Sequence, residues 1–269
     1  VQLQVLPKEA ANSDLLLEIV SEKVNAEKSS IKHIEILKRS IDARQKITKI
    51  NLSVAIYINE SCNIVKKIIT EYKDVRNAQE VIIIGAGPAG LFAALKLLTK
   101  GLQPIIIERG KDVRARRLDL AKLTKEHIVN EDSNYCFGEG GAGTYSDGKL
   151  YTRSTKRGDV ENILDVLIHH GANPEIKVDA HPHIGTNKLP KIIKAIRETI
   201  IKYGGKVLFN SRVTDIIIKN KKVDGVLLHN GDKINASKII LATGHSARDI
   251  FELLHKKEIV IEAKAFALG

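Results

Sequence analysis

Apolar residues are most concentrated between residues 81 and 107. A run at residues 81–84 leads into a glycine-rich turn, a longer stretch covers residues 91–98, and another run covers residues 104–107. Short continuous apolar runs indicate buried strands, and a longer run bounded by glycines indicates a buried helix. The pattern therefore predicts a strand, a turn, a helix that ends at Gly101, and a second strand.

The first 78 residues mostly alternate apolar and polar positions, as half-buried strands do, but two stretches have helical spacing. We expect Ser13 to cap the first of these helices. Strands are expected at residues 1–6, 31–41 and 47–58, and helices at residues 14–24 and 62–72. The order β-α-β-β-α is most of a ferredoxin-like sandwich. It predicts a small α+β ferredoxin-like domain over residues 1–78, before a second domain over residues 79–269.

The rest of the second domain mixes helices with short strands. Residues 110–128 are rich in arginine and lysine and predict a surface helix. Two further helices are expected at residues 160–170 and 189–203. A three-stranded β-meander is predicted at residues 206–209, 213–218 and 223–228, and a buried strand at residues 239–241.

The turn after residue 84 has the sequence Gly-Ala-Gly-Pro-Ala-Gly, and an acid ends the next strand. Gly85 permits a tight turn, Gly87 leaves the backbone open to a pyrophosphate, and Gly90 lets the helix pack close to the strand. The Glu108 carboxylate can accept hydrogen bonds from a ribose. This spacing is typical of a βαβ unit that binds the ADP half of a dinucleotide, although glycines also mark structural turns in buried α/β cores. The residues expected to bind the cofactor here are Gly85, Gly87, Pro88, Ala89, Gly90, Glu108 and Arg109.

A second glycine-rich stretch has five glycines within residues 138–148. Such a sequence forms a helix or strand only at a high cost in conformational entropy, but it lets a backbone lie flat against a ligand. We expect Gly140, Gly141, Ala142 and Gly143 to contact the ribityl–flavin part of a cofactor; a flexible surface loop is the alternative. The strand at residues 239–241 runs into another small-residue turn, made of Ala242, Thr243 and Gly244.

Composition narrows the class of protein. With 269 residues, 43% of them hydrophobic and 28% charged, the chain is globular. The net charge of +11 is spread along the chain and aromatic residues make up 4%, which disfavours nucleic-acid binding. Cys62 and Cys136 lie far apart, so we expect no disulfide framework and a cytoplasmic location. The apolar segment at residues 81–98 is interrupted by glycines and Lys96, so no membrane association is expected.

The order of these elements resembles the glutathione-reductase-type FAD-binding fold, in which the βαβ unit, a β-meander and an Ala-Thr-Gly strand form one three-layer ββα Rossmann-like domain. The chain more closely resembles the uncharacterised FAD-dependent dehydrogenases of bacteria, which carry a small ferredoxin-like domain before the FAD domain. The matching segments are residues 40–44, 134–153, 179–189 and 242–251.

The resemblance implies a bacterial flavoprotein with FAD as cofactor. It implies that the backbone of Val213 meets the adenine and that Ala242, Thr243 and Gly244 form the second FAD motif. It also implies that family members continue past residue 269, that a substrate domain begins near residues 246–269, and that the continuation holds the last FAD motif. The redox Cys-x4-Cys pair of the disulfide reductases is missing, because Cys136 has no partner nearby.

These observations predict a FAD-dependent oxidoreductase that transfers a hydride or electrons between a small-molecule substrate and FAD, with NAD(P)H as a candidate donor. The candidates for proton transfer or anion binding are Asp147, Lys149, His181, His183 and His245. No metal site is expected, because His181 and His183 lack a matching set of further ligands. The alternative is a non-catalytic FAD-binding module, or an RNA- or protein-docking module that uses the N-terminal domain; an NAD-only dehydrogenase is disfavoured by the second and third small-residue stretches.

Overall fold

The computed structural model describes residues 1–61, 71–152 and 158–265. Contacts divide the chain into two compact units. The first unit comprises Val1–Ile69 and Asp147–Gly185, and the second comprises Thr70–Ser146 and Thr186–Gly269. The predicted domains at residues 1–78 and 79–269, including a substrate domain that begins near residue 246, stay a prediction.

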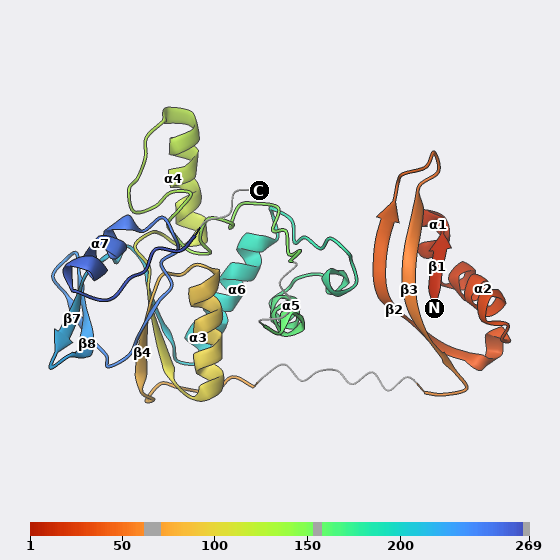
Figure 1. The fold of residues 1–269 in the computed structure, drawn as a ribbon, viewed down its shortest axis with the longest axis horizontal. Helices are drawn as coiled ribbons and strands as arrows, with labels where there is room; N and C mark the ends of the chain where they lie inside the picture. The colour runs from red at the N-terminus through yellow and green to blue at the C-terminus, as the bar shows by residue number, and fades with distance from the viewer. Residues whose placement is uncertain (62–70, 153–157, 266–269) are drawn as a thin grey trace. The chain divides into compact units, whose positions relative to one another are not determined.

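An antiparallel three-stranded sheet forms the N-terminal part of the first unit (Figure 1). Its strands are β1 (Gln2–Val5), β2 (Ile31–Asp42) and β3 (Lys49–Ile58), in the order β1-β3-β2. One face is apolar and packs on helix α2 (Ser13–Val24), where Leu3, Val20 and Leu52 belong to a single core cluster. The alternating sequence pattern thus folds as predicted, with one buried and one polar face.

Two details of this region differ from the prediction. Asn12, rather than Ser13, caps α2, because its side chain accepts hydrogen bonds from the backbone N–H groups of Asp14 and Leu15. A short helix α1 (Pro7–Ala10), which was not predicted, precedes it. The predicted helix at residues 62–72 lies almost entirely outside the described residues, so the ferredoxin-like assignment stays a prediction.

The described residues of the rest of the first unit contain three further elements. These are the 3₁₀ turns η1 (Lys28–Ser30) and η2 (Pro174–Lys177) and the helix α5 (Val160–His169). The segment after η2 lies beside β2: the Arg39 N–H donates to the Val178 carbonyl at 2.7 Å, and the Ala180 N–H donates to the Arg39 carbonyl at 2.9 Å. These bonds join parts of the chain that are more than a hundred residues apart.

A parallel four-stranded sheet is the centre of the second unit. Its strands are β4 (Glu80–Ile84), β5 (Gln103–Ile107), β6 (Lys206–Leu208) and β10 (Ile239–Leu241), in the order β10-β4-β5-β6. The isoleucine runs of β4 and β5 are buried throughout. Continuous apolar strands are expected where a parallel sheet is covered on both faces.

Helices α3 (Pro88–Lys100) and α6 (Leu189–Lys202) cover one face of this sheet, and a meander covers the other (Figure 1). The meander consists of β7 (Val213–Lys219), β8 (Lys222–Leu228) and β9 (Lys233–Asn235). Ile82 and Ile84 pack against Val213 and Val226 on the meander side. The three layers and the C-terminal cap of α3 at Gly101 agree with the prediction.

The predicted composition of the meander was wrong at both ends. Residues 206–208 pair with β5 in the parallel sheet, and the third meander strand is β9, which was not predicted. Helix α4 (Val113–Glu126) follows β5, and helix α7 (Arg248–Lys256) packs against β7 through Ile250 and Leu254. In the part of the chain that the structure describes, no helix has the length and apolar character needed to span a membrane.

Candidate cofactor site

Two glycines of the turn between β4 and α3 are required by the packing of the chain itself. Gly85 has φ +107°, and a Cβ atom there would lie 2.4 Å from the Ala242 carbonyl oxygen on the neighbouring strand. A Cβ atom on Gly90 would lie 2.0 Å from the Gly85 carbonyl oxygen, because α3 starts directly against the turn. Both distances are too short for any side chain, so the fold itself requires glycine at these two positions. These glycines are therefore not evidence for a bound ligand.

Gly87 differs from its neighbours. It has φ −72° and is the N-cap of α3, and a Cβ atom there would meet nothing closer than the Gly141 Cα atom at 3.9 Å. The protein's own packing would therefore tolerate a side chain at this position, but that side chain would enter a cavity. The first-turn N–H groups of α3 have no acceptor within the helix, and together with the helix dipole they favour an anion.

Glu108 lies at the end of β5 with its side chain buried. Its carboxylate accepts hydrogen bonds from the backbone N–H groups of Ala86 at 2.7 Å, Gly110 at 2.9 Å and Gly138 at 3.0 Å. A carboxylate has about four lone-pair positions, so one remains available beyond these three bonds. Glu108 thus fastens the turn to the glycine-rich loop, and it also lines the cavity.

Arg116 of helix α4 holds the glycine-rich loop in place. Its side chain is fully buried, and it donates to the carbonyl oxygens of Asn134 at 2.9 Å, Glu139 at 2.9 Å and Gly141 at 2.8 Å, with further bonds to Tyr135, Gly138 and Thr144. Burial lowers the pKa of the guanidinium below its ordinary value. The predicted surface helix forms as α4 and exposes Arg114 and Arg117, but Arg116 on its inner side lies inside the protein.

The loop also packs tightly on the turn. A Cβ atom on Gly138, which has φ +117°, would lie 2.4 Å from the Arg116 Cδ atom, and the Gly140 N–H donates to the Ala86 carbonyl at 2.8 Å. These contacts favour a packed loop over the alternative of a flexible surface loop. Residues 131–148 form bends and turns without a helix or strand, as the glycine content predicts.

The loop itself contains a buried charged residue, Glu139. Its Oε2 atom accepts a hydrogen bond from the Val113 N–H at the start of α4 at 2.8 Å, and its Oε1 atom lies 3.3 Å from the Arg197 Nε atom. Burial raises the pKa of the carboxyl above 4.5, its ordinary value. Neither Arg116 nor Glu139 was identified from sequence, because charged residues in a basic, glycine-rich region carry no signal of burial.

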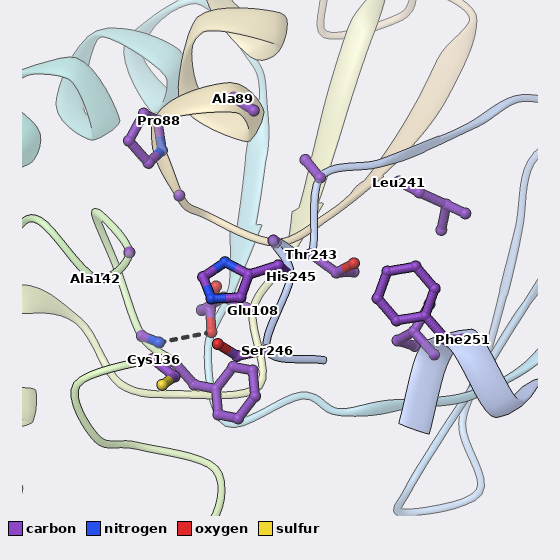
Figure 2. Close-up of a pocket in the computed structure, with 18 of the residues that line it drawn as sticks. Pro88, Ala89, Glu108, Cys136, Ala142, Leu241, Thr243, His245, Ser246 and Phe251 are labelled. Atoms are coloured by element: carbon purple, nitrogen blue, oxygen red, sulfur yellow. Dashed lines mark hydrogen bonds between the residues drawn. The ribbon is translucent and has the colours of Figure 1, made fainter. Parts of the chain in front are cut away.

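The turn, the loop and the strand end at β10 surround one cavity of about 480 Å³ (Figure 2). A smaller cavity of about 40 Å³ adjoins it and shares Gly85, Glu108 and Thr243 with it. The predicted cofactor residues that line one or both cavities are Gly85, Gly87, Pro88, Ala89, Glu108, Arg109, Gly141, Ala142, Val213, Ala242, Thr243 and Gly244. Gly90, Gly140 and Gly143 do not line either cavity.

Apolar side chains complete the wall of the larger cavity. Leu241 is the last residue of β10, Phe137 belongs to the loop, and Ile250 and Phe251 belong to α7. Figure 2 shows Leu241 and Phe251 on one side of the cavity and Pro88, Ala89 and Ala142 on the other. Arg109 lines the smaller cavity, stacks 4.5 Å from the Phe137 ring centre and forms an ion pair with Asp249 of α7.

Residues 79–251 match the family model described as pyridine nucleotide-disulphide oxidoreductase. The chain belongs to this family. Proteins of this oxidoreductase family bind FAD and NAD(P). Residues 1–57 match a separate family, described only as a domain of unknown function.

Individual relatives extend the comparison. A Clostridium beijerinckii protein, named only as uncharacterized, is 40% identical over 265 residues, which are 93% of this chain and 49% of that protein. The chain thus spans about half the length of this relative. Thiamine thiazole synthase from Methanococcus vannielii is 25% identical over 68% of this chain and 63% of that protein. The solved structure of THI4 from Thermovibrio ammonificans has a TM-score of 0.45 at 20% identity, covering 68% of this chain and 64% of that chain, and supports no functional comparison.

Among the described residues, the cavity is lined by one cysteine and no disulphide. Cys136, which lines it, is a free thiol with an exposed side chain. Among residues 1–61, 71–152 and 158–265, no group of three or more histidine, cysteine or acidic side chains could hold a metal ion.

The five predicted polar candidates fall into different units. His245 follows the turn after β10 and lines the larger cavity. The other four, Asp147, Lys149, His181 and His183, belong to the first unit, where the Lys149 ammonium lies 3.7 Å from the Asp147 carboxylate. His181 and His183 there line a separate cavity of about 520 Å³. Of the five, His245 lines the candidate cofactor cavity, and a role in catalysis stays a prediction for all five.

Proposed function

We propose that the cavity binds FAD, with the ADP half at the start of α3 and the flavin end toward the glycine-rich loop and the turn after β10. The observation that carries this proposal is Gly87. The packing of the protein does not require a glycine there, but a side chain at this position would occupy the cavity in which the cofactor is proposed to bind. The residues present fit such a cofactor: an uncapped helix N-terminus for the pyrophosphate, a carboxylate at the ribose position, and close backbone approach at Gly141.

We further propose that the protein is a FAD-dependent oxidoreductase that acts on a small-molecule substrate, with NADH or NADPH as the candidate donor. The flavin would supply the hydride or electron transfer, and the chain would supply binding and orientation. The amides of α3 would hold the anionic centre of the cofactor, and Leu241, Ile250 and Phe251 would offer an apolar surface to its uncharged part. His245 is the side chain in the cavity best suited to hold or donate a proton.

The test uses the protein extended to the length of its Clostridium relative, since the chain spans about half of that relative. We expect the purified protein to show a flavin absorption band and to release FAD on denaturation. Under anaerobic conditions NADH or NADPH should bleach that band. A folded preparation that neither contains flavin nor takes up added FAD would contradict the proposal. A flavin that stays oxidised with both donors would instead favour the non-catalytic FAD-binding alternative.

A further inference from the structure

A second depression of about 670 Å³ lies between helices α4 and α6. Five of the side chains that line it are cationic, and none is acidic. Arg114, Arg117 and Lys125 come from one face of α4, and Lys191 and Lys194 come from the first turns of α6. We call this depression the α4–α6 groove.

Most of these cations are uncompensated. Lys194 forms an ion pair with Glu198 at 3.4 Å. The other four, Arg114, Arg117, Lys125 and Lys191, have no acidic partner within the described ranges. Four unpaired cations around one concave surface repel one another, so an anion bound between them would relieve that repulsion. Some cations elsewhere on the surface, such as Lys206 and Lys219, pair with carboxylates.

The remaining lining suits a nucleotide. The rings of Tyr135 and Tyr145 lie on the glycine-rich loop, and the Tyr145 hydroxyl is fixed by donating to the Val113 carbonyl. Aromatic faces stack on nucleobases, while arginine and lysine bind phosphate oxygens. Arg114 and Lys125 are eleven positions apart, about 16 Å along the helix, which is enough for several phosphate and sugar groups. The volume lies within the range of small-molecule sites, about 300–1,000 Å³, and is small for an extended strand of nucleic acid.

We propose that the α4–α6 groove binds a phosphate-bearing nucleotide, at a site distinct from the FAD cavity. The glycine-rich loop separates the two: Tyr135 and Tyr145 line the groove, whereas Cys136, Phe137 and Ala142 line the cavity. This site goes beyond the proposed FAD function and does not depend on it.

The test measures equilibrium binding of ATP by the full-length protein in the presence of saturating FAD, so that the cavity is not the site observed. Adenosine serves as the phosphate-free probe. The variant is Arg117→Glu combined with Lys191→Glu. The control is Lys222→Glu combined with Lys233→Glu, which changes the charge equally on the exposed meander. Both variants should keep the melting temperature and FAD content of the unmodified protein.

We expect ATP affinity to fall about 10-fold or more in the groove variant, as expected for the loss of a charge-assisted hydrogen bond, and to change less than about 2-fold in the control. Adenosine should bind much more weakly than ATP. Equal ATP binding by the two variants, equal binding of adenosine and ATP, or no ATP binding by the folded protein would overturn the proposal. So would a single-stranded RNA that binds far more tightly than ATP and is displaced by the same two substitutions, because the groove would then serve nucleic acid.

Discussion

The two glycine-rich walls of the cavity are held in place by different means. The turn at Gly85–Gly90 is fixed by backbone contacts with β10 and α3, at distances that exclude any side chain. The loop at residues 134–146 is fixed largely by buried charged side chains: Arg116 donates to carbonyl groups along its length, and Glu108 accepts from the Gly138 N–H. One wall therefore depends on the backbone packing of the sheet and helix, and the other depends on buried charged side chains, of which Arg116 forms the most hydrogen bonds. This difference predicts that the two walls can be disturbed separately.

Replacement of Arg116 should have the largest effect. Arg116→Met leaves the carbonyl oxygens of Asn134 and Tyr135 without another donor among the described residues. Each unsatisfied group costs about 1–3 kcal/mol, so we expect a loss of about 2 kcal/mol or more in the free energy of unfolding. Chemical denaturation measures this loss. Lys122→Met on the exposed side of the same helix is the matched control and should change stability by less than about 0.5 kcal/mol. An Arg116→Met protein as stable as the control would show that the loop does not need this anchor.

Gly90→Ala disturbs the other wall. The added Cβ atom would lie 2.0 Å from the Gly85 carbonyl oxygen, so α3 must shift away from the turn. Overpacking of this kind costs about 1–3 kcal/mol. Thermal denaturation should detect it, whereas Gly158→Ala, where an added Cβ atom meets no other atom, should leave the melting temperature unchanged. Equal stability of the two variants would contradict the close packing of the turn.

Gly87→Thr separates ligand binding from folding. Threonine is about as good an N-cap as glycine, and the backbone at φ −72° accepts it, so we expect little change in stability. Its side chain would enter the cavity where the pyrophosphate is proposed to bind, and FAD affinity should fall about 10-fold or more, which corresponds to about 1.4 kcal/mol. Titration of the apoprotein with FAD measures this effect. Unchanged FAD affinity would remove the main support for the cofactor site.

The smallest expected effect concerns the buried Glu139 carboxyl of the loop. Burial raises its pKa in the folded protein, so its stabilising contribution is complete below the unfolded pKa, near 4.5, and is lost as the pH rises through the folded pKa. Glu139→Gln removes this titration and should therefore become more stable relative to the unmodified protein as the pH increases from 4.5. Denaturation at a series of pH values, with the exposed Glu126→Gln as control, tests this trend. A stability difference between Glu139→Gln and the unmodified protein that stays constant over this range would show that the carboxyl does not titrate as described.

The structure of the turn at Gly85–Gly90 could be predicted from the sequence, but the way in which the loop at residues 134–146 is held in place could not. The isoleucine runs of β4 and β5, and the glycines between β4 and α3, each satisfy a local rule, so their structure could be predicted residue by residue. Arg116 could not be recognised, because Arg114 and Arg117 on the same helix are exposed and only the path of the distant loop distinguishes the three. The misplacement of β6 has a related cause, since a three-residue, half-buried strand does not reveal which sheet it joins.

The most direct test of the central claim is the amount of FAD retained by the folded full-length protein and by its Gly87→Thr variant at equal stability. We predict bound FAD in the unmodified protein, released by denaturation, and strongly reduced FAD in the variant. Equal FAD content in the two proteins would contradict the assignment of this cavity to the cofactor. So would a folded unmodified protein that contains no FAD and does not bind added FAD.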